Sequence, residues 1–282
     1  MPLLSLVALA ALTPSTGFAM LVLALLLGGT INAIVGICLL VGGTRHHEQS
    51  YTQSGVTVGL AMLTTLATLT LVLPNYTVSE SGPFYSPAQL AYVAVISLAI
   101  YATFVVAQTL RHRDHFRHGE PDDHAHEDPV PPAKAAASGV MLLISLVGVV
   151  LLAKSLSPAI EAAVANLGAP RAAVGIVIAL LVLAPEGFAA VRAARANRVQ
   201  TSLNLAIGSA LATIGLTIPA VAGIALYMNL DLALGLTMSN TVLLALTLLV
   251  ASLTLGTGRT TLVQGVIHLV LFATFLFIAL VP

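Results

Sequence analysis

Charged residues are scarce in this chain of 282 residues. Asp, Glu, Lys and Arg make up only 8% of the sequence, Trp is missing, and 58% of the residues are apolar. A soluble domain has about 25% charged and about 45–50% apolar residues. The chain has too few charges to cover a water-exposed surface. Its mean hydropathy of +1.00 therefore predicts an integral membrane protein.

The sequence also lacks an excess of basic charge and a second cysteine. Its 11 Lys and Arg residues balance 11 Asp and Glu residues, so the formal net charge is zero. Nucleic-acid binding is therefore disfavoured, because phosphate contacts need clustered basic side chains. Cys38 is the single cysteine, which excludes an intrachain disulfide, and its apolar surroundings in the sequence predict a packing role.

Apolar runs of about 20 residues, the length needed to cross a bilayer core of about 30 Å, recur along the chain. Eight of them lie at approximately 18–42, 56–74, 88–110, 139–156, 171–191, 200–227, 233–255 and 261–281. The apolar segment 2–12 is too short to span, lacks a basic signal-peptide region and is typical of a helix end. We predict an all-α, polytopic membrane protein with eight transmembrane helices and an N-terminal helix remnant.

Basic residues are concentrated in alternate connections between the predicted spans. The odd-numbered connections hold nine of the 11, namely Arg45, Arg111, Arg113, Arg117, Lys134, Arg192, Arg195, Arg198 and Arg259. The connections at 75–87 and 228–232 hold none. Because short basic loops stay in the cytoplasm, we predict that the odd-numbered connections are cytoplasmic and that Pro282 lies outside.

A long polar loop at 111–138 separates an N-terminal part, 1–110, from a C-terminal part, 139–282. Histidines and acidic residues are mixed in this loop, a composition that cannot bury a core. It predicts a disordered cytoplasmic linker. The run His-Ala-His-Glu-Asp at 124–128 leaves a second interpretation open, in which the loop binds a divalent cation loosely.

One acidic residue, Glu186, lies inside a predicted span. A charge at bilayer depth costs at least about 2.5–3.5 kcal/mol on insertion scales, so such residues commonly mark ion or proton pathways. The neighbours Pro185 and Gly187 predict a kinked or interrupted helix, whose carbonyl oxygens and carboxylate suit calcium. Competition between a proton and a metal ion for one carboxylate is the physical basis of antiport. The alternative is that Glu186 snorkels to the cytoplasmic interface near Arg192.

The next span carries a stripe of hydroxyl groups. Ser209, Thr213 and Thr217 recur every four residues and so share one helix face, beside Gly208, which permits close helix packing. We predict that Ser209 and Thr213 join Glu186 in binding a cation and protons. Hydroxyls in transmembrane helices also bond their own backbone, and this alternative stays open.

A short internal echo relates the two parts of the chain. Residues 29–36, which include Thr30 and Asn32, match residues 208–215 with both bounding glycines at the same spacing. The two copies lie on spans of opposite predicted direction, as inverted repeats require. The span with Glu186 precedes the second copy, whereas no acidic residue precedes the first.

Several motifs carry a family resemblance over nearly the whole chain. They are Pro185-Glu186-Gly187, Asn197-Arg198-Val199-Gln200, Asn204, Gly208-Ser209, Thr217-Ile218-Pro219, Thr257-Gly258-Arg259-Thr260, Gly265, His268-Leu269 and, in the first part, Gly42-Gly43-Thr44-Arg45 followed by Gln49-Ser50-Tyr51. With these motifs the chain resembles bacterial calcium/proton antiporters of the ChaA type, within the cation/calcium exchanger superfamily.

The resemblance implies an inverted-repeat fold in the bacterial inner membrane and exchange of calcium, or of sodium or potassium, against protons. It implies no cofactor and no enzymatic chemistry. Glu186 matches the acidic residue of the second repeat, which in the family binds the cation and the exchanged protons. Family members also carry an acidic residue in the first repeat, so we expect residues 1–110 to form an incomplete repeat that lacks the first acidic helix.

Two other functions are alternatives to transport. An intramembrane enzyme is disfavoured because the spans contain no second carboxylate and no His-Glu-x-x-His motif; their one histidine, His268, is typical of a helix interface. The other is a non-transporting membrane scaffold, or a subunit whose partner supplies the missing helices. The sequence leaves the oligomeric state open, a homo-oligomer included.

Overall fold

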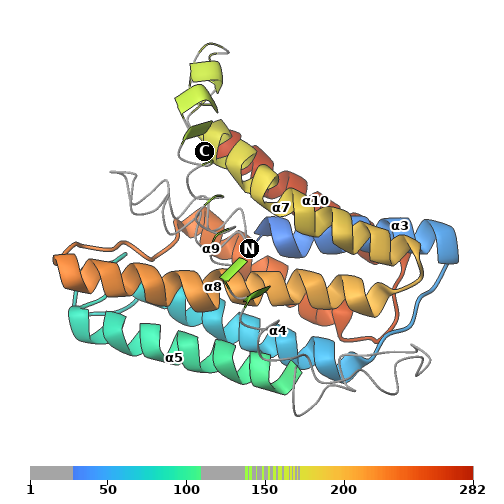
Figure 1. Cartoon of the computed structure of the whole chain (residues 1–282), viewed down its shortest axis with the longest axis horizontal. Coiled ribbons are helices and arrows are strands. Elements are labelled where there is room, and N and C mark those ends of the chain that lie inside the picture. The colour runs from blue at the N-terminus through green and yellow to red at the C-terminus, as the bar shows by residue number, and fades with distance from the viewer. Residues whose placement is uncertain are drawn as a thin grey trace.

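The computed structural model describes residues 28–108 and 172–281, with scattered positions between 137 and 170. Outside two isolated β-bridges, the regular elements of the described residues are helices (Figure 1). They are η1 (Gly29–Val35), α3 (Gly36–His46), α4 (Gln53–Ala67), η2 (Thr68–Val72), η3 (Leu73–Asn75), α5 (Pro87–Val106), α7 (Ala172–Arg195), α8 (Val199–Met228), α9 (Met238–Leu255) and α10 (Leu262–Leu280). The predicted all-α fold is confirmed.

Five helical segments in the described part are long and apolar enough to cross a membrane, and the two halves of a bent α7 form a sixth. They are Gln53–Asn75, Pro87–Val106, Val199–Met228, Met238–Leu255 and Leu262–Leu280, and they correspond to six of the predicted spans once α7 is added. The predicted span at 18–42 is represented by the shorter apolar helix Ile31–His46. The segment 2–12 lies outside the described residues, and 111–138 and 139–156 have at most scattered described positions.

Local capping signals explain where several helices begin. Ser86 accepts a hydrogen bond from the backbone of Gln89, whose side chain bonds back to Ser86, and Pro87 follows at the first helical position of α5. Thr261 and Gln264 form the same reciprocal pair at the start of α10. Such caps satisfy N–H groups that a helix start leaves without partners, so these boundaries are set by the sequence itself.

Three of the connections that carry basic residues lie in the described part of the chain, and they meet at one end of the bundle. The His46 Nε2 atom lies 3.1 Å from the Arg195 carbonyl oxygen, and Ser50 pairs with Arg259 in a β-bridge. The exposed side chains of Arg259 and Glu48 lie 3.9 Å apart. Connections after α3, α7 and α9 therefore share one side, as the charge pattern predicts.

The connections that lack Lys and Arg meet at the opposite end. Asn75 Nδ2 donates a hydrogen bond of 2.7 Å to the Leu236 carbonyl oxygen, and Phe84 pairs with Ala233 in the second β-bridge. Since α3 ends and α8 begins at the basic end, the two copies of the internal echo run antiparallel (Figure 1). That arrangement is the one that inverted repeats require.

Gln49 ties the first basic connection to the other two. Its backbone N–H donates to Thr260 Oγ1 (3.1 Å), and its Nε2 donates to Asn197 Oδ1 (2.7 Å). Two residues later, the Tyr51 hydroxyl donates to the Leu255 carbonyl oxygen (2.9 Å), and burial raises the pKa of this tyrosine. The loop between α3 and α4 is thus fixed to both second-half connections.

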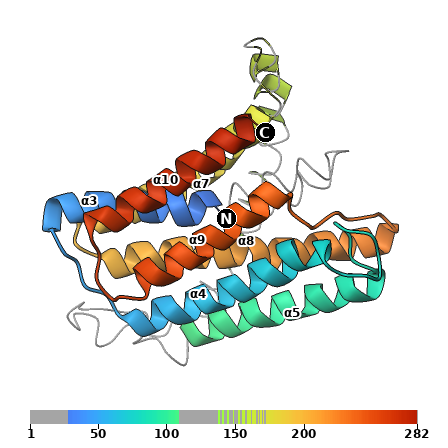
Figure 2. The same ribbon diagram turned by 180° about the vertical axis from the view of Figure 1, so that it is seen from behind.

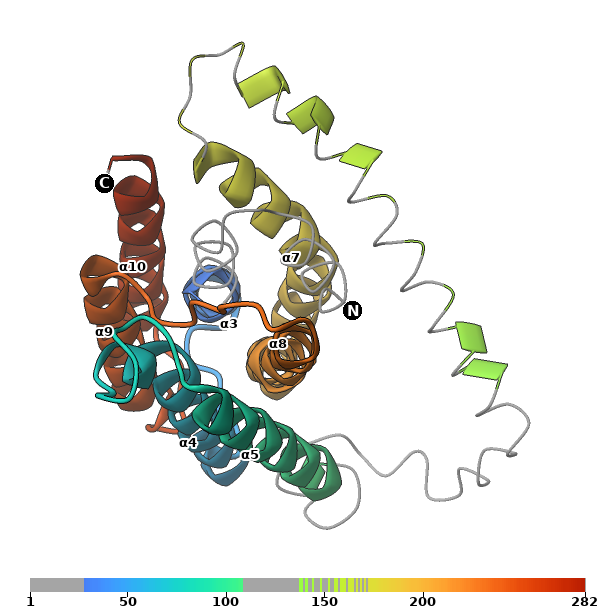
Figure 3. The same ribbon diagram turned by 90° about the vertical axis from the view of Figure 1, so that its left-hand side faces the viewer.

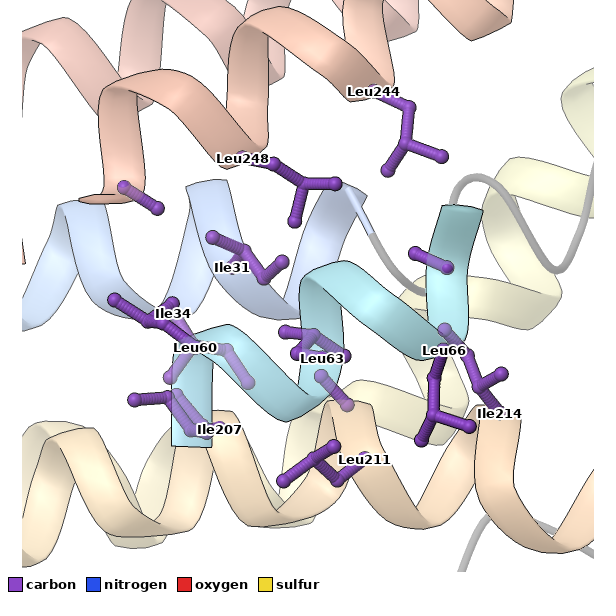
Figure 4. Packing of buried hydrophobic residues seen from close by; sticks show 14 of the residues in the cluster. Ile31, Ile34, Leu60, Leu63, Leu66, Ile207, Leu211, Ile214, Leu244 and Leu248 are labelled. Carbon is purple, nitrogen blue, oxygen red and sulfur yellow. The ribbon is translucent and has the colours of Figure 1, made fainter. Parts of the chain in front are cut away.

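The apolar core centres on α4. Its leucines Leu60, Leu63 and Leu66 point into the space bounded by η1, α8 and α9 (Figure 4). There they meet buried residues of those three elements, namely Ile31, Ile34, Ile207, Leu211, Ile214, Leu244 and Leu248. α9 lies between α4 and α10 (Figure 2), and α3 lies between α10 and α7 (Figure 3). This packing places η1 in the middle of the bundle, in contact with α7, α8, α9 and α10.

Candidate functional site

The helix that carries Glu186 is bent. Pro185 lacks a backbone N–H, and its ring clashes with the carbonyl group four residues earlier, which belongs to Leu181. α7 accordingly bends by 50° between Ala173–Leu181 and Leu183–Arg195. The predicted kink is confirmed. The helix is not interrupted, however, because helical backbone continues through Pro185 from Ala172 to Arg195.

Glu186 faces the neighbouring helix α8. The Ser209 hydroxyl donates a hydrogen bond to the Glu186 Oε2 atom, and both residues are half-buried. α7 and α8 pack directly against each other. The carboxylate therefore lies at the interface of α7 and α8, half-buried and bonded to the Ser209 hydroxyl.

The other hydroxyls of the predicted stripe are placed differently. Thr213 is buried, and its hydroxyl donates to the Ser209 carbonyl oxygen of its own helix (2.8 Å). Thr217 is also buried, and within the described residues its hydroxyl oxygen has no hydrogen-bond partner. Among the described contacts of these three residues, only Ser209 has a hydrogen bond to Glu186. Thr213 instead bonds the backbone of its own helix, which is the alternative left open for the stripe.

The two glycines proposed to shape the site differ little in their surroundings. A Cβ atom on Gly187 would lie 3.9 Å from Ile34 Cγ1, which brings η1 next to the residue after Glu186. A Cβ atom on Gly208 would lie 3.9 Å from the Phe104 ring on α5. Both distances are ordinary van der Waals contacts, so neither glycine is required by crowding.

Asn32, from the first copy of the echo, lies in a different polar cluster. It is fully buried in η1, the element that also contains Thr30, and its Nδ2 donates to Thr247 Oγ1 on α9 (2.9 Å). Its Oδ1 lies 3.0 Å from the Nδ1 atom of His268 on α10. The amide is thus bonded to α9 and α10, and Glu186 is not among its described partners.

No group of three or more His, Cys, Asp or Glu side chains in the described ranges, 28–108 and 172–281 with the scattered positions, could hold a metal ion. The described side-chain partner of Glu186 is a neutral hydroxyl group, that of Ser209. Hydroxyl and carbonyl oxygens are suitable cation ligands beside a carboxylate, since hard cations take these ligands as readily as carboxylates.

Comparison with known proteins identifies the family. Residues 4–110 and 137–281 match the family model of the sodium/calcium exchanger protein. The chain is 45% identical over 238 residues to y4hA of Sinorhizobium fredii, a protein named as an ionic transporter, covering 84% of this chain and 65% of that protein. It is 34% identical over 226 residues to the sodium-potassium/proton antiporter ChaA of Escherichia coli, covering 79% and 61%. The chain thus spans less than two thirds of these relatives.

Solved structures show the same fold at low sequence identity. The structure of native YfkE superposes with a TM-score of 0.75 at 14% identity and covers 99% of this chain and 80% of that one. The crystal structure of the H+/Ca2+ exchanger CAX gives a TM-score of 0.69 at 16% identity, with 98% and 70% covered. The chain belongs to the sodium/calcium exchanger family, within the cation/calcium exchanger superfamily, and has the polytopic membrane fold of that family.

Proposed function

We propose that this chain is a secondary active antiporter that exchanges calcium for protons across a bacterial inner membrane, with sodium and potassium as the alternative cations. The observation that carries the proposal is the Glu186–Ser209 pair at the interface of α7 and α8. A lone acid at bilayer depth is costly, and such residues usually mark an ion or proton pathway. The non-transporting scaffold does not explain why this acid is retained beside a proline bend.

Both cargoes use the same two side chains in this proposal. With Glu186 ionised and no cation bound, the Ser209 hydroxyl donates to the carboxylate, as in the structure. A bound cation would be contacted by the carboxylate and by the lone pairs of the Ser209 oxygen. A protonated Glu186 would instead donate to Ser209. Proton and cation therefore exclude each other at one position, which couples their transport.

The bend of α7 supplies further oxygen atoms. Because Pro185 has no N–H, the carbonyl oxygen of Leu181 cannot receive the helical hydrogen bond that residue 185 would otherwise donate. A carbonyl released in this way near a carboxylate is a neutral ligand for a hard cation. The spacing places Thr213 on the same face of α8 as Ser209. Its hydroxyl oxygen would become a further cation ligand once the hydroxyl no longer bonds the backbone of its own helix.

Relatives and structural neighbours support proton coupling but differ in the cation. ChaA of Escherichia coli is named as a sodium-potassium/proton antiporter, and CAX as an H+/Ca2+ exchanger. Calcium is our leading choice because a carboxylate with carbonyl and hydroxyl oxygens is a hard-ligand set. We also infer that 1–110 and 139–282 are the two repeats and that 111–138 links them in the cytoplasm. No cofactor is needed, since exchange involves no covalent chemistry.

The test uses everted membrane vesicles that contain the 282-residue chain and carry a respiration-driven pH gradient. Addition of calcium should dissipate the gradient in wild type, and the response should disappear in Glu186→Gln, which keeps the size of the side chain and removes its charge. Glu80→Gln changes an exposed carboxylate outside the helices and is the matched control. Sodium and potassium are added in parallel.

Two results would contradict the proposal in different ways. If Glu186→Gln responds like wild type at equal protein levels, the site is wrong. If wild type responds to none of the three cations, this chain is not an antiporter by itself and the scaffold or partner-dependent subunit is favoured.

A further inference from the structure

A second polar cluster lies in the membrane-spanning region, apart from the Glu186–Ser209 pair. It joins Thr247 and Thr254 on α9, Asn32 on η1 and His268 on α10. Asn32, Thr247 and His268 are 0% exposed. Buried polar groups are costly unless they are hydrogen-bonded, so a cluster of this kind needs an explanation.

The cluster is a chain of hydrogen bonds with His268 at its centre. Nδ1 of His268 lies 3.0 Å from Asn32 Oδ1, and its Nε2 lies 2.9 Å from Thr254 Oγ1. The Thr254 hydroxyl also lies 2.7 Å from the Val250 carbonyl oxygen of its own helix. Thr254 therefore keeps a partner without His268, whereas Asn32 needs His268 to pair its Oδ1 atom among the described residues.

The bond from His268 reaches an element that has little support of its own. η1 is a π-helix of seven residues without a side-chain cap, and such wide turns are rare and persist where tertiary contacts hold them. Tight packing places His268 against its C-terminal end: a Cβ atom on Gly36 would lie 3.1 Å from the His268 Cβ atom. The hydrogen bonds of Asn32 to Thr247 and His268 thus connect η1 to α9 and α10.

The opposite side of η1 faces the candidate ion site. η1 contacts α7 and α8, the two helices that carry Glu186 and Ser209. Ile34 of η1 approaches the position next to Glu186, since a Cβ atom on Gly187 would lie 3.9 Å from Ile34 Cγ1. A shift of η1 toward α10 or away from it would therefore change the wall of the ion site.

We propose that His268 is a positioning residue: through its hydrogen bond to Asn32 it holds η1 against α7 and thereby sets the cation affinity of the Glu186 site. This proposal rests on the proposed function of that site. His268 itself contacts neither cation nor transported proton. It acts through the placement of η1.

Three substitutions at His268 separate the two hydrogen bonds. His268→Asn keeps a polar group at the place of Nδ1 and can still bond Asn32, whereas His268→Gln reaches the place of Nε2 and can bond only Thr254. His268→Leu fills the space with neither bond. Thr70→Val is the control, because Thr70 is equally buried but its hydroxyl bonds only the Leu66 carbonyl of its own helix.

Cation affinity is measured as the half-saturating calcium, sodium or potassium concentration that protects the detergent-solubilised chain from thermal unfolding, and as KM in proteoliposomes. His268→Gln and His268→Leu should raise both values by about fivefold to tenfold, the size expected for one lost buried hydrogen bond. Vmax should change by less than about twofold, since a positioning group of this kind alters binding rather than the later steps. His268→Asn and Thr70→Val should stay close to wild type.

The pattern among the variants decides the proposal. Equal losses in Asn, Gln and Leu variants would show that only the imidazole shape matters, and affinities equal to wild type in all three would show that the bond has no role; either result overturns it. Failure of the proposed function gives a different pattern, in which Glu186→Gln retains thermal protection or wild type binds cations without transporting them. Loss of affinity confined to the Gln and Leu variants, together with loss of thermal protection in Glu186→Gln, supports the positioning role.

Discussion

The two copies of the glycine-bounded echo, 29–36 and 208–215, have the same spacing but different structures. The second copy is regular α-helix within α8, and its Ser209 reaches Glu186 on α7. The first copy forms the π-helical η1, and its Asn32 turns to α9 and α10. The two segments thus turn polar residues at different positions of the echo to different partners, Ser209 to the candidate ion site and Asn32 to α9 and α10.

The second glycine of each copy, Gly36 or Gly215, packs closely against a neighbouring helix. A Cβ atom on Gly36 would lie 3.0 Å from Leu269 Cγ on α10, and one on Gly215 would lie 2.7 Å from Tyr101 Cβ on α5. Both glycines permit close helix approach, as expected for small residues in membrane helices. Both halves thus use the second glycine for close packing, whereas Ser209 and Asn32, which stand at different positions of the echo, turn to different partners.

The largest effect on stability is expected at Asn32. Asn32→Leu leaves Thr247 Oγ1 and His268 Nδ1 buried without this partner, and each such group costs about 1–3 kcal/mol. The unfolding free energy should fall by about 3 kcal/mol, measured as reduced thermal stability in detergent. Ser209→Ala, in the other copy, should cost less than about 1 kcal/mol because the half-buried Glu186 can be hydrated. Equal losses at the two positions would contradict the division of roles.

The next effect is on cation affinity, and it is expected at Ser209, the position where the effect on stability is small. Ser209→Ala removes the hydroxyl oxygen that, in the proposed function, contacts the bound cation beside the Glu186 carboxylate, and should therefore weaken cation binding by about tenfold. Thr213→Val removes a hydroxyl bonded to its own helix and should have a smaller effect. Thermal protection by calcium measures both. A larger loss in Thr213→Val would mean that Thr213, and not Ser209, contacts the cation.

A smaller effect on stability is expected at the second glycines. Gly215→Ala forces a methyl group to within 2.7 Å of Tyr101 Cβ and should destabilise the chain by about 1–3 kcal/mol. Gly208→Ala meets only the Phe104 ring at 3.9 Å and should be tolerated. Thermal unfolding of the two variants side by side tests whether the shared packing role belongs to the second glycine alone.

The smallest effect is expected at Gly187. Its added methyl group would meet only Ile34 at 3.9 Å, and alanine is favoured over glycine in a helix by about 1 kcal/mol. Gly187→Ala should therefore raise the unfolding free energy by up to about 1 kcal/mol. A loss of stability would show that the bend of α7 depends on this glycine as well as on Pro185.

Much of the architecture could be predicted from apolar run length, charge distribution and proline. The spans at 56–74, 88–110, 200–227 and 261–281 lie within a few residues of observed helices, and the α7 kink follows from Pro185. The contact between Glu186 and Ser209 could also be predicted, since the two residues lie on consecutive predicted spans and carry complementary groups.

The cluster around His268 could not be predicted in this way. Asn32 is separated by 215 residues from Thr247 and by 236 from His268, and no local pattern links them. The glycine spacing of 29–36 does not predict a π-helix either, because the matching segment 208–215 has the same spacing and is α-helical. For this reason the sequence predicts only a helix-interface role for His268.

The sequence by itself determined that the chain spans a membrane, which connections share a side, and that one acid lies at a proline bend, because hydropathy, charge bias and the missing proline N–H act over a few residues. Only the tertiary structure decided that Ser209, rather than Thr213, bonds Glu186, and that Asn32 faces His268. Those choices depend on how helices far apart in the sequence pack, since a buried polar side chain must turn to whichever partner the fold brings within hydrogen-bond distance.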